Sequence, residues 1–401
     1  MANLNQTDLV PDFEAISGIS EFAGMPICYY DIISNNLDTC TFFVLFEENH
    51  RPVGLPDNLL IRFEKQRDGN PLLATAALQQ LAHLEAPYLV PKVWGSGETQ
   101  AGDGTKLSYM LSQFHPDTCT LESVWEDLGQ DEQLSLMKDV VDAMAQFQSI
   151  CLTNLSDEAK EILKNTPFDP TTMGPVTRVG GPEFGYFHDF SSFLKTTLEP
   201  GKAKYDIWIK HDGTVVIQVH SPDEIGIGFA VTELDLLVKT SVLCHNDMEP
   251  RNLLVRKVPG EVEPKYELVA IINWRMAGFF PFAFEVGRKD TCLGLQNHSW
   301  SWYDLFRNLT GQAFLTGTSG NAIRSKLIRA LFFTDRTRKL GNSLNVGNRV
   351  QILWHEKERL VLSSLAEKGF VKRKNAEGMG PSTPVDTAEL EQEALRELGY
   401  I

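Results

Sequence analysis

Apolar and polar residues alternate along several short stretches near the start of the chain, and Asn, Asp, Gly and Pro separate these stretches. Their content of Ile, Val, Phe and Tyr favours strands at residues 25–33, 39–48 and 58–65. Apolar residues then recur at helical spacing from Leu73 to Leu84, and residues 88–97 and 106–114 return to an extended pattern. We therefore predict the order strand, strand, strand, helix, strand, strand in a small sheet.

The spacing of apolar residues changes after this sheet and becomes helical. Leu134, Met137, Val141 and Met144 follow one face of a helix, and Asp131 ahead of them is a suitable N-cap residue. Similar patterns predict helices at residues 322–333 and 349–368. Residues 372–387 are rich in Gly, Pro and small polar residues, which indicates a linker, and a short helix is predicted at residues 388–401. The second part of the chain is therefore mainly helical.

One segment of this helical part has a β-like pattern. Residues 241–244 are apolar and lead into a polar run from His245 to Asn252, after which two extended stretches around a Gly- and Pro-containing turn predict a hairpin. The polar run therefore lies on a turn, where functional side chains are often presented. Asp, Asn and Pro are also ordinary turn formers, so a purely structural turn is the alternative.

Composition narrows the range of partners. The chain has 401 residues, of which 42% are hydrophobic, and its formal net charge is −16, so we expect neither a basic surface nor nucleic acid as a partner. The first residues show no secretory pattern, and no long uncharged apolar run follows, which predicts a cytoplasmic location without membrane contact. The six cysteines are scattered, which predicts reduced thiols and argues against a zinc site.

The polar run resembles a catalytic loop. Its sequence HNDMEPRN, with His245, Asp247 and Asn252, is similar to the His-x-Asp-x4-Asn loop of the aminoglycoside phosphotransferase and choline kinase-like superfamily. The hairpin after it ends in AIINWRMAGFFPFAFE, residues 270–285, where that superfamily usually has Ile-Asp-Trp-Glu, then a glycine, an aromatic-Pro segment and a later Glu. The likeness is nearest to uncharacterised fungal phosphotransferase family proteins.

This resemblance implies a fold and an activity. The fold is α+β, a bilobal protein kinase-like fold with a small β-rich N-terminal lobe and a larger helical C-terminal lobe. Residues 1–114 would form the nucleotide-binding lobe, residues 115–370 the catalytic and acceptor-binding lobe, and residues 371–401 the linker and terminal helix. The implied activity is transfer of a phosphoryl group from ATP, with Mg²⁺, to a hydroxyl of a small molecule.

The loop residues suit phosphoryl transfer, which needs a group that orients the attacking hydroxyl and oxygen ligands for Mg²⁺. By the resemblance, Asp247 accepts the hydroxyl proton, Asn252 and Asn273 lie at the metal, and His245 supports the turn from below. Asn273 stands where the superfamily has an aspartate. An amide oxygen brings no negative charge, so weaker metal binding is expected, with Glu249 and Glu285 as alternative acidic groups.

The small lobe departs from the pattern too. Arg62 stands in the strand that normally carries a phosphate-binding lysine, with an ordinary surface arginine as the alternative. The predicted helix at Leu73–Leu84 has no glutamate to pair with that cation, which leaves Glu64 and Glu85 as candidates. The hairpin that covers the nucleotide has a single glycine, Gly24, although close approach of backbone to phosphate favours several.

Two further segments are candidates for ligand contacts. The strand that ends at residues 112–114 resembles the connector that contacts adenine, through Ser112, Gln113 and Phe114. Further on, His188 and Asp189 lie in a Gly-Pro-aromatic segment similar to one in fungal relatives, but we expect them to be surface polar residues. A group of aromatic residues is expected in the core, with an acceptor pocket as the alternative: Phe279, Phe280, Phe282, Phe284, Trp300 and Trp302.

Two functions follow from the sequence. The first is an ATP- and Mg²⁺-dependent small-molecule phosphotransferase with an altered metal site. The second is a kinase fold that no longer transfers phosphoryl groups and serves as a binding protein or in metal-independent biosynthetic chemistry. A protein kinase is disfavoured, because the chain has Asn-Trp-Arg at residues 273–275 and no recognisable Asp-Phe-Gly or Ala-Pro-Glu segment.

Overall fold

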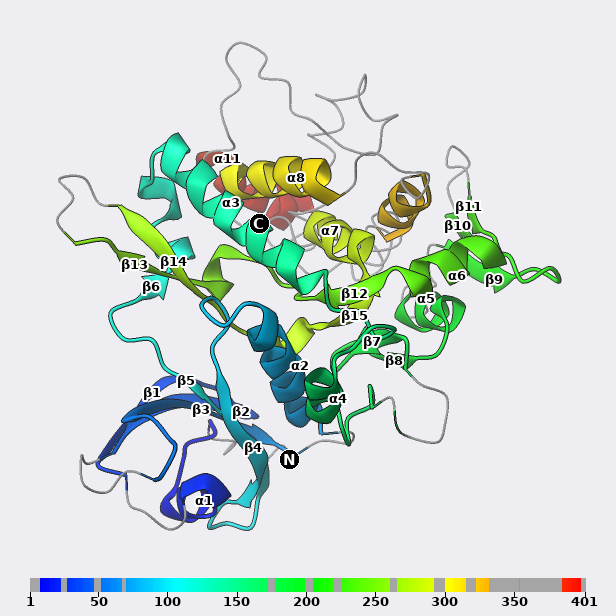
Figure 1. The fold of residues 1–401 in the computed structure, drawn as a ribbon. Coiled ribbons are helices and arrows are strands. Elements are labelled where there is room, and N and C mark those ends of the chain that lie inside the picture. Colours follow the sequence, from blue (N-terminus) through cyan, green and yellow to red (C-terminus); the bar gives the residue numbers. More distant parts are fainter. Residues whose placement is uncertain are drawn as a thin grey trace.

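The chain forms two lobes joined through helix α2, with the small lobe at the bottom of Figure 1 and the large lobe above it. The computed structural model describes residues 8–22, 27–46, 52–66, 70–169, 171, 177–198, 205–219, 226–259, 265–291, 300–314, 322–331, 353 and 384–397. This arrangement is the predicted bilobal α+β fold, with a β-rich N-terminal lobe and a larger C-terminal lobe that holds most of the helices.

The small lobe is a five-stranded antiparallel sheet with the strand order β1-β2-β3-β5-β4. Its elements are α1 (Phe13–Ser17), η1 (Ser20–Phe22), β1 (Tyr29–Asn35), β2 (Thr39–Leu45), β3 (Asn58–Lys65), α2 (Pro71–Glu85), β4 (Val93–Gln100) and β5 (Lys106–Gln113). The predicted order of five strands and one helix is confirmed. The short helix α1 was not predicted, because five residues are too few for a helical period to show.

The two faces of this sheet pack against different partners. One face buries residues such as Phe42, Ile61 and Leu111 against α1. On the other face Met110 lies in a small apolar cluster with Leu72 of α2. Strand alternation places every second residue of β3 on one face, and the next strand's Met110 is the register partner of Arg62, so Arg62 and Glu64 share the face that α2 covers.

Helix α2 belongs to both lobes. Its Leu78, Leu81 and Ala82 are buried in the large hydrophobic core that also contains residues of α3. The helix packs on β4 and β5 of the small lobe and on α3, α4 and η6 of the large lobe. In Figure 1 it lies between the small sheet and strands β12 and β15. The large-lobe core therefore fixes the helix that covers the small sheet.

The large lobe surrounds three small sheets with helices. Its elements are β6 (Cys119–Thr120), η2 (Leu121–Ser123), η3 (Trp125–Asp127), α3 (Gln130–Phe147), α4 (Asp157–Ile162), β7 (Val179–Gly181), β8 (Gly185–Phe187), α5 (Phe190–Leu198), β9 (Tyr205–Ile209), β10 (Val215–Val219), β11 (Ile227–Phe229), α6 (Val231–Lys239), β12 (Ser241–Cys244), η5 (Pro250–Asn252), β13 (Leu253–Lys257), β14 (Tyr266–Ile271), η6 (Trp274–Met276), β15 (Gly278–Pro281), α7 (Phe282–Thr291), α8 (Trp300–Phe314) and α11 (Pro384–Glu397). The sheets have the orders β11-β10-β9, β12-β15-β7-β8 and β14-β13-β6.

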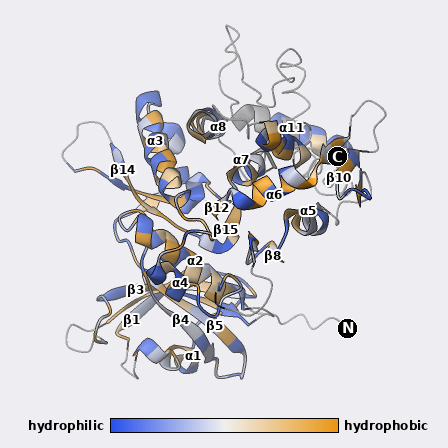
Figure 2. Ribbon diagram, turned by 45° about the vertical axis from the view of Figure 1, so that its right-hand side comes forward, coloured by the Kyte–Doolittle hydropathy of each residue, from blue (hydrophilic) through white to orange (hydrophobic). Residues whose placement is uncertain are grey.

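Helix α3 has the predicted amphipathic face, but its cap is different. Met137, Val141 and Met144 are buried, and Figure 2 shows hydrophobic and hydrophilic residues on opposite sides of the helix. The N-cap is Gly129, and Asp131 lies inside the first turn, so the predicted capping role of Asp131 is wrong. Its carboxylate still lies near the N-terminal end of the helix dipole, where a negative charge is favourable.

The C-terminal predictions are confirmed in part. Residues 322–331 are helical, which covers most of the helix predicted at 322–333. Helix α11 begins at Pro384, so the last four residues of the predicted linker are helical, and Pro at the first helical position explains this earlier start. Apart from residue 353, the helix predicted at 349–368 lies outside the described residues, as does the rest of the linker. Within the described chain, no helix has the length and hydrophobicity needed to cross a membrane.

Candidate active site

Two antiparallel strand pairs hold the polar loop. Strand β12 leads into it and pairs with β15, and β13 leaves it and pairs with β14, so the predicted loop and hairpin are confirmed. The Ile272 N–H donates a hydrogen bond of 2.9 Å to the Asn252 carbonyl. This pairing brings the end of the loop beside Asn273, which begins the second motif.

His245 lies beneath the loop and is fully buried. Its Nε2 lies 3.0 Å from the Ile272 carbonyl, and its Nδ1 accepts a hydrogen bond of 3.3 Å from the Asp247 N–H. The ring also packs edge-to-face on Trp274 with centroids 4.8 Å apart. Burial lowers the pKa of His245, and the neutral ring with its proton on Nε2 satisfies both contacts. The histidine therefore links the backbones of the two motifs.

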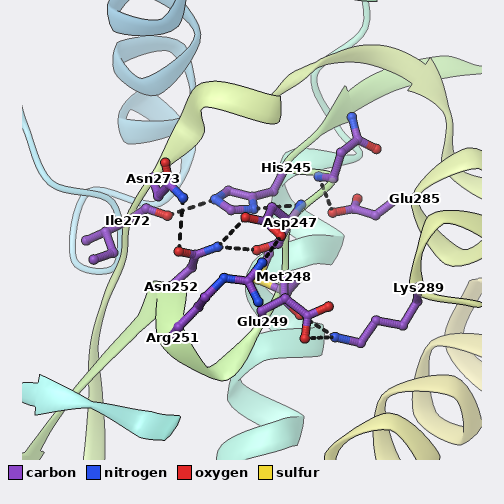
Figure 3. A network of polar contacts seen from close by, with 11 residues as sticks. His245, Asp247, Met248, Glu249, Arg251, Asn252, Ile272, Asn273, Glu285 and Lys289 are labelled. Carbon is purple, nitrogen blue, oxygen red and sulfur yellow. Dashed lines mark hydrogen bonds and ion pairs between the residues drawn. The ribbon is translucent and has the colours of Figure 1, made fainter. Parts of the chain in front are cut away.

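Both carboxylate oxygens of Asp247 accept hydrogen bonds from within the loop (Figure 3). The Arg251 guanidinium donates to Oδ1 at 2.6 Å, and the Asn252 Nδ2 donates to Oδ2 at 2.7 Å. The same amide nitrogen donates to the Asp247 carbonyl at 2.7 Å. The Asp247 side chain keeps 14% of its surface exposed, so it remains accessible from outside the loop.

Arg251, which the sequence pattern did not single out, contacts Asp247 from within the same loop. It lies four residues after Asp247 in a 3-10 turn that begins at Pro250, and this spacing brings its guanidinium back to the carboxylate. An arginine four residues after an acid in such a turn is the signal that would have identified it. The charge-assisted bond fixes the direction in which Asp247 points.

Asn252 links Asp247 to Asn273. The Asn273 Nδ2 donates a hydrogen bond of 3.1 Å to the Asn252 Oδ1 (Figure 3). Asn273 has left-handed backbone angles, φ 64° and ψ 59°, a conformation that Asn and Asp adopt more readily than other residues with a side chain. The predicted base Asp247 and the two predicted metal ligands, Asn252 and Asn273, therefore form one hydrogen-bonded chain.

These side chains have the chemistry of a magnesium site with low charge. Mg²⁺ takes oxygen ligands, and the chain offers the Asp247 carboxylate and the amide oxygens of Asn252 and Asn273. Half a turn of the Asn273 amide would exchange its donor nitrogen for its oxygen beside Asn252. The residues therefore fit the ion, with one negative charge in the set. In the structure, however, the Asn273 Nδ2 points at the Asn252 oxygen, so a donor lies where two metal ligands would meet.

Glu249 forms a buried ion pair and does not join the metal ligands. Its carboxylate lies 2.6 Å from the Lys289 Nζ, and both side chains are at most 3% exposed. Lys289 also donates a hydrogen bond of 3.0 Å to the Met248 carbonyl. Burial raises the pKa of the Glu249 carboxyl, and the positive charge of Lys289 opposes that rise. The pair attaches the middle of the loop to helix α7. No motif or spacing in the sequence singles out Lys289.

Glu285 holds the start of the loop. It is buried, and its Oε1 accepts a hydrogen bond of 2.8 Å from the Asn246 N–H. Burial raises the pKa of Glu285 to about 7. Lys289 lies four residues later on the same helix, so one face of α7 supplies both buried groups that hold the loop. Asn246 itself has a left-handed backbone with φ 60°.

Arg62 has a partner in its own strand. Its Nε and Nη2 both donate to the Glu64 Oε1, at 2.9 and 2.6 Å. Of the two acids that the sequence left open, the structure thus pairs Glu64 with Arg62, whereas Glu85 is exposed at the end of α2. Gly24 lies outside the described residues.

The three residues expected at the adenine differ in their surroundings. The Ser112 side chain is buried, and its hydroxyl accepts a hydrogen bond of 3.1 Å from Gln79 of α2. The Gln113 N–H donates to the Lys92 carbonyl at 2.8 Å. Phe114 lies beyond the end of β5, and its ring stacks on Phe43 with centroids 4.9 Å apart.

The other candidate residues are structural. The Asp189 carboxylate accepts a hydrogen bond of 2.8 Å from the Ser192 N–H at the start of α5, and His188 is exposed, as expected for surface polar residues. The expected aromatic core is confirmed for five buried residues: Phe279, Phe280, Phe282, Phe284 and Trp302. The side chain of Trp300 lies outside the described part of the chain.

No family model matches the sequence, and no curated protein matches it. Among solved structures, one similar chain is a provisionally assigned aminoglycoside phosphotransferase from Ralstonia eutropha, with a TM-score of 0.42, 10% identity, and 93% and 91% of the two chains covered. A provisionally assigned fructosamine-3-kinase from Haemophilus somnus has a TM-score of 0.42 and 9% identity over 86% and 95% of the chains. Spectinomycin phosphotransferase, crystallised with ADP and spectinomycin, has a TM-score of 0.34 and 12% identity over 92% and 94%.

Proposed function

We propose that this protein transfers a phosphoryl group from ATP to a hydroxyl of a small molecule, with Asp247 as the base. The observation that carries this proposal is the hydrogen-bonded chain from Asp247 through Asn252 to Asn273, which joins the two motifs in one place. Residues 1–114 would bind the nucleotide and residues 115–370 would carry the catalytic and acceptor sites. We also propose that this protein is related to the fungal phosphotransferase family proteins that its motifs resemble.

In this reaction Asp247 orients the acceptor hydroxyl and takes its proton. The acceptor oxygen forms a new bond to the γ-phosphorus while the bond from that phosphorus to the bridging oxygen breaks, and ADP leaves. Arg251 keeps the carboxylate pointed in one direction, and Asn252 holds its second oxygen. A positioned base of this kind contributes about 10² to 10⁴ in rate.

Asn252 and Asn273 would hold Mg²⁺, with Asp247 as the nearby negative charge, and the bound ion would neutralise charge on the phosphates. The positive charge of Arg62 would lie on the phosphates, and Phe114 would lie beside the adenine. Because the ligand set has one carboxylate, we expect weak metal binding. We place the protein in the cytoplasm, where ATP and Mg²⁺ are available.

The alternative is a kinase fold without phosphoryl transfer, used for ligand binding or for metal-independent biosynthetic chemistry. Two contacts support it. The side-chain Nδ2 of Asn273 donates a hydrogen bond to the Asn252 Oδ1, and the Arg251 guanidinium donates one to the Asp247 carboxylate. In this interpretation hydrogen bonds have replaced the metal. The two functions differ in whether Mg²⁺ changes nucleotide affinity.

Calorimetric titration with ATP, with and without Mg²⁺, decides between them. The phosphotransferase should bind ATP more tightly with Mg²⁺ and consume it with a hydroxylated acceptor. Asp247→Ala should then lower kcat by at least about 10² while ATP affinity stays within a few-fold. Asp142→Ala, on the exposed side of α3, is the matched control and should keep full activity. Absence of ATP binding by the unaltered protein would rule out the proposed function.

A further inference from the structure

Helix α2 does not provide the acidic partner that a phosphate-binding cation usually needs. Its only acid is Glu85, which is exposed in the last turn. Its buried polar residues are Thr75, whose hydroxyl donates to the Pro71 carbonyl of the same helix at 2.9 Å, and Gln79, whose Nε2 donates to the Pro91 carbonyl at 2.8 Å and to the Ser112 hydroxyl at 3.1 Å. Gln79 is thus committed to β5 and to the segment just before β4. A carboxylate for Arg62 must come from another element.

Strand β3 supplies this carboxylate itself. Arg62 and Glu64 are two residues apart, so strand alternation places both on the face covered by α2. The Glu64 Oε1 accepts from Nε and Nη2 of Arg62, and the Glu64 side chain is 8% exposed, so its charge is largely removed from water. A guanidinium has five N–H groups in a planar fork, and these two bonds leave others for a phosphate.

The positive charge of a second arginine, Arg275 in the large lobe, acts on Glu64 without a hydrogen bond between the two side chains. Arg275 follows Asn273 in η6, which packs against α2, and its guanidinium pairs with Glu183 between β7 and β8. The hydrogen bond to Glu183 raises the pKa of Arg275, and the negative charge of Glu64 acts in the same direction. The charges therefore alternate in the order Arg62, Glu64, Arg275, Glu183 from the small lobe to the large lobe.

Two departures from the superfamily pattern are electrostatically compatible: the missing acid of α2 and the arginine at position 275. The pattern has a glutamate where this sequence has Arg275, and a second carboxylate close to Glu64 would repel it. Arginine at this position turns the repulsion into attraction. The Glu64 carboxylate thus has an arginine partner in its own strand and lies within the field of a second positive charge from the large lobe.

We propose that Glu64 is the positioning residue that orients Arg62 toward the nucleotide phosphates, and that the positive charge of Arg275 stabilises the Glu64 carboxylate from the large lobe. This inference rests on the proposed nucleotide-binding function. An ion pair between a strand and a helix forms only when the helix is correctly placed, which is how kinases of that design are switched. A pair within one strand does not depend on the helix, so the phosphate site of this protein is preformed.

The test compares ATP with adenosine, which lacks phosphate, as ligands in calorimetric titrations. Glu64→Gln should weaken ATP binding about tenfold and leave adenosine affinity unchanged, because only phosphate uses Arg62. Glu98→Gln, an exposed glutamate on β4, is the matched control and should change neither affinity. Thermal unfolding of each variant shows whether it is folded, and Glu64→Asp provides a second, milder variant that keeps the charge.

The contribution of Arg275 is measured by a double-mutant cycle with Glu64. Arg275→Glu should weaken ATP binding at least about tenfold in the unaltered background, and by much less when Glu64→Gln has removed the carboxylate. Equal ATP affinity of the Glu64→Gln and unaltered proteins, or an equal loss for adenosine, would overturn the positioning role. A protein that binds neither ligand before any substitution would instead refute the proposed function.

Discussion

The groups that hold the loop and the groups that face the proposed ligands differ in how far they depart from the superfamily pattern. His245 and Glu285 hold the loop, match the residue types that the resemblance leads us to expect, and are buried with hydrogen-bond partners in other segments. Arg62 and Asn273 face the proposed ligands, and both differ in chemistry from the residue that the resemblance leads us to expect. The buried supports of the loop thus match the resemblance, whereas the charge around the loop does not.

This difference shows which constraints come from folding. A buried group that loses its partner costs the protein stability whatever ligand it binds, so the supporting contacts tolerate little change. Groups at the ligand side are partly exposed to water, and a change of charge there alters binding more than folding. Compared with the residues that the resemblance leads us to expect, Asn273 and Arg275 each make the second motif less negative.

The largest expected effect comes from breaking the support of the loop. Lys289→Met leaves the Glu249 carboxylate buried without its cation, and we expect the free energy of unfolding to fall by about 3–5 kcal/mol. Lys160→Met, which removes an exposed ion pair with Asp157, should change it by less than about 1 kcal/mol. Denaturant unfolding of both variants measures the difference. Equal effects would show that the buried pair does not support the loop.

A smaller effect concerns the pH dependence of the same support. Burial raises the pKa of Glu285 from 4.5 to about 7, so the folded protein holds this proton more tightly than the unfolded chain. The stabilisation from Glu285 is therefore complete below about pH 4.5 and is lost as the pH rises through 7, by up to about 3 kcal/mol. Glu285→Gln removes the titrating group and keeps an acceptor for the Asn246 N–H.

The measurement is the difference in unfolding free energy between the unaltered protein and Glu285→Gln from pH 5 to 8. This difference should shift in favour of the glutamine variant as the pH rises to about 7 and should level off above it. Glu267→Gln, an exposed glutamate on β14, should give a difference that does not vary with pH in this range. A flat difference for Glu285→Gln would show that its carboxyl is not ionising near neutrality.

The sequence predicted the elements of the fold better than the contacts between them. Period-two and helical patterns located β3 and α2 well, because each buries one face and the pattern records that face. The motif spacing likewise predicted that Asp247 and Asn252 share a loop. Partners from distant segments left no such pattern: Lys289 became visible only when α7 was placed against the loop.

Helix capping and ion pairs between nearby residues were also predicted poorly from the sequence. Asp131 suits an N-cap by type, yet the N-cap is Gly129 and α3 begins at Gln130, two residues earlier than a cap at Asp131 would place it. The Arg62 and Glu64 pair lies within one strand, where the sequence suggested Glu64 and Glu85 as equal candidates. Glu64 contacts Arg62 and Glu85 is exposed to solvent, and this difference depends on how α2 packs in the folded protein.

The smallest expected effect comes from Asn273→Asp, which tests the charge at the proposed metal site. The new carboxylate loses the hydrogen bond from Nδ2 to the Asn252 Oδ1 and lies near the charge of Asp247, so without metal we expect a loss of about 1 kcal/mol in stability. The second carboxylate is a better ligand for Mg²⁺, and metal affinity should rise about tenfold, which is about 1.4 kcal/mol. Thermal unfolding over a range of Mg²⁺ concentrations measures both effects.

Asn165→Asp is the matched control, because Asn165 also has a left-handed backbone but lies outside the loop and the second motif. Its stability should not respond to Mg²⁺ beyond the response of the unaltered protein. If Asn273→Asp gains stability with Mg²⁺ and this control does not, the ligand side has lost charge while its geometry has been kept. If Asn273→Asp gains no stability with Mg²⁺, the polar loop and the second motif do not bring their oxygens together around a metal ion. The metal-independent function then becomes the better account of this site.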